Sequence, residues 1–168
     1  MRPFYRIRQF LRALVAAPPS GAPPELGPGL RELFVAMSPA DRSHALRARA
    51  GLAGEAAPPD LVVAALLHDV GKSGAPIHLW DRAIFVLAER FFPRWLDRLA
   101  GRDGLPFGAG LVALQRHARL GAQWVAAAGG SPRLVDLIRY HHTDPATLGW
   151  QDGERQLLEA LQRADEQA

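Results

Sequence analysis

The chain contains no cysteine, and Lys72 is the single lysine among its 20 basic residues. Without cysteine, disulfides and thiolate metal sites are excluded, so any metal would be held by histidine and carboxylate ligands. No uncharged apolar run reaches the roughly 18 residues that a membrane-spanning helix needs. Alternation of apolar and polar residues never lasts more than a few positions, so the sequence predicts an all-α fold.

The overall composition is that of an ordinary globular domain. Hydrophobic residues make up 48% of the 168 positions and charged residues 22%, which is sufficient for one domain with its own core. The net charge of +3 is small, and the basic residues form no dense cluster. These features argue against nucleic acid as the principal partner, and we expect a cytoplasmic protein.

The sequence divides into three regions. Residues 1–17 form a basic amphipathic segment, residues 18–29 a linker rich in proline and glycine, and residues 30–168 the main domain. A helix in the first segment would place four apolar side chains on one face: Phe4, Ile7, Leu11 and Leu14. This face either packs on the domain or makes a peripheral membrane or partner contact through residues 3–16.

Several helix starts can be recognised from their capping residues. Ser38 and Ser131 are each followed by proline, the pattern of an N-cap serine with proline in the first helical position. Asp152 is predicted to cap the last helix. Two further helices are predicted over residues 58–70, closing at a glycine, and over residues 111–128, with a break near Gly121.

An apolar run ends abruptly at the adjacent pair His68 and Asp69, which Gly71 and Lys72 follow closely. A carboxylate near the C-terminus of a helix lies at the negative end of the helix dipole, where it is disfavoured. Asp69 therefore needs a compensating cation, and a bound metal ion would supply one. The alternative is a solvated carboxylate at a helix end.

Further metal-ligand residues lie on other predicted helices. His44 alone would be an ordinary surface or core histidine, and His141 with His142 could simply favour the negative end of a helix. Taken together, however, five helices each offer a ligand that suits a metal ion. We therefore predict a metal centre formed by His44, His68, Asp69, His117, His141 and Asp165.

The order of these residues resembles that of the HD-domain superfamily of metal-dependent phosphohydrolases, over residues 38–166. The resemblance implies a bundle of about six to eight helices with the metal site in its centre. It also implies that the primary metal is held by His44, His68, Asp69 and Asp165. His117 and His141 resemble the additional histidines of the two-metal branch of this superfamily.

The sequence motif His-Asp-Val-Gly-Lys is similar to the corresponding motif of cyclic-dinucleotide phosphodiesterases and diadenosine tetraphosphate hydrolases of the superfamily. The Gly-Tyr-Pro segment of the cyclic-di-GMP phosphodiesterases is absent, and Thr143, Asp144 and Pro145 stand in its place. This departure argues against cyclic-di-GMP as the substrate. The stretch between Lys72 and His117 is long and rich in aromatic residues, and we expect residues 73–107 to be an insertion that covers the site.

The resemblance implies an enzyme with two divalent transition metals, drawn from iron, manganese, nickel, cobalt and zinc, and bridged by Asp69. A metal-activated hydroxide would attack the phosphorus of a phosphomonoester or phosphodiester, expected to be nucleotide-like. Lys72 either approaches a substrate phosphate or balances the end of a helix. His142 either protonates the leaving oxygen, binds metal, or orients a metal ligand without binding the metal itself. Arginines close to the ligands are candidate phosphate contacts: Arg47, Arg116 and Arg139.

Two other functions remain open at this stage. Some HD-fold proteins with a similar histidine-rich pattern use a di-iron pair for oxygen-dependent cleavage. A signalling module could keep the metal only to stabilise its fold. The first alternative would show oxygen uptake with substrate, and the second would hold metal without turnover.

Overall fold

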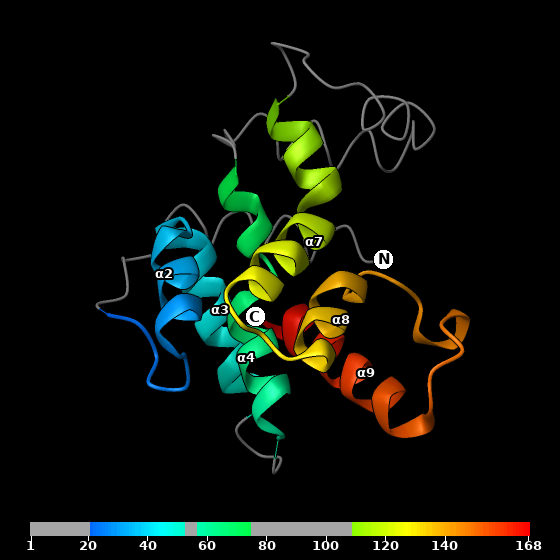
Figure 1. The fold of residues 1–168 in the computed structure, drawn as a ribbon. Coiled ribbons are helices and arrows are strands. Elements are labelled where there is room, and N and C mark those ends of the chain that lie inside the picture. Colours follow the sequence, from blue (N-terminus) through cyan, green and yellow to red (C-terminus); the bar gives the residue numbers. More distant parts are fainter. Residues whose placement is uncertain (1–20, 53–56, 75–108) are drawn as a thin grey trace.

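The computed structural model of the protein describes residues 21–52, 57–74 and 109–168. The amphipathic helix predicted over residues 3–16 and the segment 75–108 lie outside these ranges. Every regular element within them is helical, which confirms the all-α fold (Figure 1). The elements in chain order are α2 (Pro28–Ala36), α3 (Pro39–Gly51), α4 (Pro59–Leu67), the 3-10 helix η1 (Val70–Gly74), α7 (Ala109–Ala127), α8 (Pro132–Tyr140), the 3-10 helix η2 (Pro145–Thr147) and α9 (Asp152–Gln167).

The two predicted serine caps are confirmed. The Ser38 hydroxyl accepts a hydrogen bond from the backbone N–H of Asp41 at 3.2 Å, at the start of α3. The Ser131 hydroxyl accepts from the N–H of Leu134 at 3.1 Å, at the start of α8. Ser131 also donates to Oδ1 of Asp60 at 2.9 Å, which ties the first turn of α4 to that of α8. Each cap satisfies an N–H that the helix leaves unpaired.

The start of α9 differs from the prediction by one residue. Gln151 occupies the cap position, and Asp152 is the first residue inside the helix. Its carboxylate pairs with Arg155 one turn later. An acidic side chain in the first turn is stabilised by the positive end of the helix dipole, which explains why this position reads as a helix start.

Helix α4 is the centre of the bundle and is apolar on every side beyond its first turn. Six of its nine residues are buried, and it contacts α3, α8 and α9. A helix that is hydrophobic on all sides can only be stable inside a core. In Figure 1 it lies between the C-terminal half of the chain and α3. The residues that follow α4 are therefore delivered to the interior of the domain.

The end of α4 was predicted at Val70, but the helix ends at Leu67. His68 and Asp69 form a turn, and the backbone tightens into η1, where the N–H of Lys72 bonds the carbonyl of Asp69 at 3.0 Å. An early end leaves carbonyl groups of the last helical turn without a helical partner. The ring of His68 supplies a partner to one of them, as described below.

The break predicted near Gly121 is wrong, because α7 continues through this residue. Gly121 instead allows close packing of α7 against η1. A Cβ on Gly71 would lie 2.0 Å from the carbonyl oxygen of His117 and 2.7 Å from the backbone N of Gly121. Two facing glycines thus let the backbones of η1 and α7 touch, as Gly residues do at close helix contacts. This contact brings Asp69 next to His117.

A cluster of buried side chains holds the helices together. Its largest fully buried members include Phe34, Leu66, Leu137 and Leu161, one each from α2, α4, α8 and α9. Within the described ranges, no helix combines the length and the apolar character needed to cross a bilayer.

We predict that Gly71→Ala destabilises the protein by about 1–3 kcal/mol, because the added methyl group meets backbone atoms that cannot rotate away. Urea unfolding followed by circular dichroism measures the effect. Gly153→Ala is the matched control, since a Cβ at this position in α9 has no atom within 4 Å. The control should gain about 0.5–1 kcal/mol from improved helix propensity. Equal unfolding midpoints for the two variants would contradict the close-contact interpretation.

Candidate metal centre

The structure brings all six predicted ligands together at one end of α4. Five of them are buried polar side chains, and the sixth, Asp165, is partly buried. They come from α3, the turn after α4, α7, the end of α8 and α9. Buried ionisable groups are rare unless they are paired or bind metal. Together with His142, these residues form two neighbouring groups.

The first group contains His44, His68 and Asp69, whose ligand atoms lie within 4.8 Å of one another. Asp165 joins it from α9. Its Oδ1 lies 2.7 Å from Nε2 of His44 and 3.5 Å from Nε2 of His68. Nε2 of His68 also lies 3.6 Å from Oδ2 of Asp69. Two imidazoles and two carboxylates therefore face a common point.

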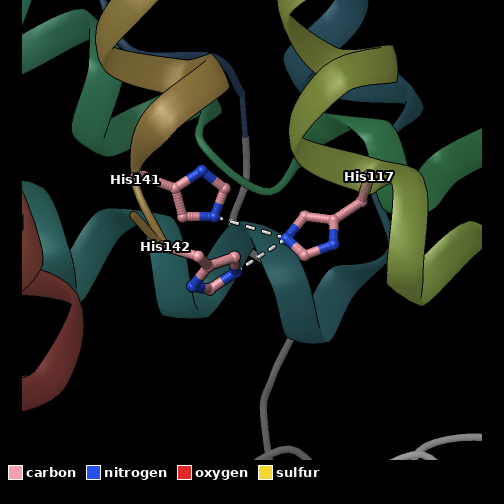
Figure 2. Close-up of side chains that lie close together, drawn as sticks. All are labelled: His117, His141 and His142. Carbon is pink, nitrogen blue, oxygen red and sulfur yellow. Dashed lines mark hydrogen bonds between the residues drawn. The ribbon is translucent and has the colours of Figure 1, made fainter. Parts of the chain in front are cut away.

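The second group contains His117, His141 and His142, again with ligand atoms within 4.8 Å of one another. Figure 2 shows the three rings turned toward each other. Nε2 of His117 lies 3.3 Å from Nε2 of His141 and 3.1 Å from Nε2 of His142. His117 and His141 are buried, whereas His142 is exposed at the rim of the group.

Three of these histidines are anchored in the same way. The Nδ1 atom of each ring bonds a backbone carbonyl three residues earlier: His68 to Ala65 at 3.0 Å, His117 to Leu114 at 2.6 Å and His141 to Ile138 at 2.7 Å. A carbonyl can only accept, so each Nδ1 carries a proton and donates it. In the neutral ring, this leaves Nε2 with a free lone pair that points into the site.

Consequently, neither Nε2 carries a hydrogen in the contact between His117 and His141. Both rings donate through Nδ1, so two lone pairs face each other across 3.3 Å when both rings are neutral. The buried Nε2 of His68 makes no hydrogen bond of good geometry, and its nearest carboxylate oxygens lie 3.5 and 3.6 Å away. A cation bound to these nitrogens would satisfy them. Two nitrogen atoms bound to one metal at about 2.1 Å each lie about 3 Å apart, which is close to the distances between the Nε2 atoms of this group.

Asp69 lies between the two groups and faces both. Its Oδ2 is the oxygen near His68, while its Oδ1 lies 3.5 Å from Nε2 of His117. One carboxylate thus places one oxygen toward each group. Lys72 donates to Oδ2 of Asp69 at 2.5 Å.

Both carboxyl groups are ionised at neutral pH. Burial by itself raises the pKa of Asp69, but the charges of Lys72 and His68 outweigh it and hold the pKa well below its ordinary value. Burial likewise opposes ionisation of Asp165, yet His68 and His44 keep its pKa well below the usual range. The site therefore presents two negative charges to a cation.

The histidines divide into two kinds. Burial, reinforced by the charge of Lys72, lowers the pKa of His117 to about 3, and burial with the charge of His68 lowers the pKa of His141 to about 4. Although part of its side chain is exposed, loss of solvent around the ring and the neighbouring imidazoles also lower the pKa of His142. Burial opposes the charged form of His68 as well, but Asp69 and Asp165 raise its pKa to about 9. A metal bound in the first group would displace this proton.

The backbone adds negative potential to the site. His68 and His141 are the C-cap residues of α4 and α8, so the C-terminal ends of two helices meet there. The unpaired carbonyls of a helix C-terminus carry a partial negative charge that favours cations. Helix ends, carboxylates and neutral imidazoles all favour a cation at this place. The described residues therefore form buried His/Asp groups that could hold metal ions.

The structure places the predicted phosphate-contacting arginines around the site rather than within the groups. Arg47 donates through Nε to the carbonyl of Ala168 at 2.8 Å. Arg116 is half-buried on α7, one residue before His117, and Arg139 is exposed on α8. Their contact with a phosphate stays a prediction.

One residue at the site was not predicted from the sequence. Gln162 lies on α9 and donates to the backbone carbonyls of His141 and Thr143. A glutamine in an amphipathic helix carries no signal of its own. Its position three residues before Asp165 would have placed it on the same helical face, which is the one indication available.

Comparison of the chain with protein-family models, curated proteins and solved structures finds no match. The HD-domain resemblance therefore rests on the order of the motifs. The geometry of the two groups is an independent observation, because ligands that lie far apart in the sequence come together in space.

We predict that the unfolding free energy of the chelator-treated protein is highest near pH 6.5. His117 and His141 have pKa values of about 3 and 4 in the fold against 6.5 ordinarily, so stability falls as the pH drops below 6.5. His68 has a raised pKa of about 9, so its contribution is present below pH 6.5 and is lost as the pH rises to 9. Each histidine changes the free energy by at most about 1.4 kcal/mol per pH unit.

Urea unfolding at a series of pH values measures this profile. In His117→Gln the decline below pH 6.5 should become shallower, because one of the histidines that resist protonation is gone. A flat profile between pH 4.5 and 6.5 would contradict the neutral state of the buried rings.

Proposed function

We propose that the protein is a two-metal phosphohydrolase of the HD type, which cleaves a phosphomonoester or phosphodiester of nucleotide-like character. The observation that carries this proposal is the position of Asp69, with one carboxylate oxygen toward each of two ligand groups. The order of the ligands along the chain supports the same assignment.

The residues that would hold the two cations follow from the two groups. His44, His68 and Asp165 would hold one, the group of His117, His141 and His142 the other, and Asp69 both. Two divalent cations at this place would supply an acidified water and charge stabilisation for a reacting phosphoryl group. The ionised state of Asp69 and the neutral rings of the second group prepare the chain for this role.

Lys72 is the proposed phosphate-binding cation of the site. Its ammonium group lies against Asp69, and its side chain keeps 15% of its surface exposed. It therefore reaches from the buried carboxylate toward solvent. A compact ammonium charge in this position suits the non-bridging oxygens of a phosphate ester.

His142 is the most accessible ring of the second group, since His117 and His141 are buried. A substrate that approaches the site from this side would meet it first. The proposed role of His142 is to complete the second group and to border the space where the leaving oxygen departs.

The decisive experiment is elemental analysis of the purified protein, followed by a screen of phosphatase and phosphodiesterase substrates with manganese, iron, nickel or cobalt added. Metal-dependent release of phosphate or of a monoester supports the proposal. Oxygen uptake with substrate and a mixed-valent iron signal would identify a di-iron oxygenase instead. Tight metal binding without turnover on the whole panel would identify a signalling module.

We predict that Asp69→Asn weakens the binding of both cations by more than about 100-fold and abolishes hydrolysis, because the shared ligand loses its charge. Elemental analysis and the substrate screen measure the two effects. Asp152→Asn is the matched control, since this carboxylate is exposed on α9. Full metal content in Asp69→Asn would overturn the bridging assignment.

We predict that Lys72→Met lowers kcat/KM for a phosphate ester by about 100-fold while both cations remain bound, because one charged partner of the phosphate is lost. Steady-state kinetics with elemental analysis on the same sample separate the two effects. Arg119→Met, which removes an exposed positive charge on α7, is the control and should retain activity. Unchanged kinetics in Lys72→Met would show that the lysine only balances Asp69.

A further inference from the structure

Gln162 makes two hydrogen bonds that have no role in the helix to which it belongs. Its Nε2 donates to the carbonyl oxygen of His141 at 3.1 Å and to that of Thr143 at 2.8 Å. A side-chain amide has two N–H donors, and both are used here. Because both partners are carbonyl oxygens, only this orientation of the amide satisfies them.

The two carbonyls belong to the residues on either side of His142. This stretch follows the end of α8, where helical hydrogen bonding stops at Tyr140 and a turn begins. The N–H of Thr143 bonds back to the carbonyl of Tyr140 at 2.7 Å and closes the turn. Gln162 thus holds the backbone before and after His142 from a different helix.

The neighbouring histidine needs this support less. His141 is buried, and its ring is anchored through Nδ1 on the carbonyl of Ile138. His142 is exposed, and its ring forms a hydrogen bond with that of His117. In Figure 2 its ring approaches His117 from below His141. The direction in which His142 points therefore depends on the backbone that Gln162 holds.

Helix α9 serves both ligand groups through residues one turn apart. Asp165 contacts His44 and His68 of the first group. Gln162 lies three positions earlier on the same face and donates to the backbone carbonyls of His141, in the second group, and of Thr143. A change at Gln162 can therefore affect the second group while the ligands of the first remain in place.

We infer that Gln162 is a positioning residue, which fixes the backbone on both sides of His142 and thereby sets the affinity of the second ligand group for its cation. This inference rests on the two-cation site of the proposed function. Residues that orient metal ligands from outside the coordination sphere typically change metal affinity by 10- to 100-fold.

The test uses the full chain and Mn²⁺ as the probe, with affinities from isothermal titration and stoichiometry from elemental analysis. Gln162→Met keeps the side-chain length but removes both donors, and Gln162→Ala removes the side chain. In each variant one cation should bind as in the unaltered protein, and the other should bind about 10- to 100-fold more weakly. Gln156→Met, an exposed glutamine on the same helix, is the matched control and should bind both cations normally.

A double-mutant cycle with His142 separates positioning from a general effect on the fold. If Gln162 acts through His142, adding Gln162→Met to His142→Ala should cause no further loss of affinity. A loss of equal size in both backgrounds would overturn the inference, as would loss of both cations or of neither in Gln162→Met. Circular dichroism of every variant checks that the helices are retained.

The outcomes also distinguish this inference from the proposed function. Selective weakening of one cation in Gln162→Met, in a protein without hydrolytic activity, would support the inference and contradict the hydrolase. Metal-dependent hydrolysis by the unaltered protein, with two equally tight cations in Gln162→Met, would support the hydrolase and contradict the inference about Gln162. Fewer than two bound cations in the unaltered protein would overturn both.

Discussion

The structure depends on one electrostatic constraint, which is the meeting of neutral imidazole nitrogens and ionised carboxylates in a buried place. His117 and His141 face each other with lone pairs because both rings already donate to carbonyls. Asp69 and Asp165 add two negative charges at the same place. An unsatisfied buried polar group costs about 1–3 kcal/mol, and Nε2 of His68 is such a group at this place. Such a cluster costs the fold stability unless a cation offsets it.

The chain on its own supplies part of this compensation. Lys72 pairs with Asp69, and His68 carries a positive charge at neutral pH between two carboxylates. These charges are monovalent, and in the second group Nε2 of His117 has only the ring of His142 as a donor among the described residues, at 3.1 Å, while Nε2 of His141 faces the lone pair of His117. A divalent cation in each group would interact with all of these atoms at once. The buried nitrogen and oxygen atoms of the site are thus only partly satisfied by the positive charges of the chain itself. The proposed function assigns the remaining interactions to bound cations.

A few recurring structural features of the helices position the two ligand groups. Helices α4 and α8 end immediately before His68 and His141, and each ring bonds a carbonyl of the last helical turn. The same bond anchors a ring and satisfies a helix end. The facing glycines of η1 and α7 bring Asp69 to His117, and α9 contacts both groups through Asp165 and Gln162.

Much of the fold could be predicted because it depends on local chemistry. The serine caps at Ser38 and Ser131 satisfy helix N–H groups within three residues, so the sequence alone reveals them. The end of α4 and the continuity of α7 could not be predicted in this way. Helix α4 stops early because the His68 ring provides an alternative partner for a carbonyl. Helix α7 tolerates Gly121 because η1 packs against it, a contact between segments about 50 residues apart.

The sequence by itself determined which residues are candidate ligands, because histidine and aspartate offer nitrogen and oxygen atoms to a metal. It also determined the all-α fold through its periodicity. The tertiary structure alone decided how the candidate ligands divide into two groups, which oxygen of Asp69 faces each group, and that Gln162 bonds the backbone on both sides of His142. These properties depend on distances between atoms from different helices. Such distances are set by packing in the core, which no local pattern records.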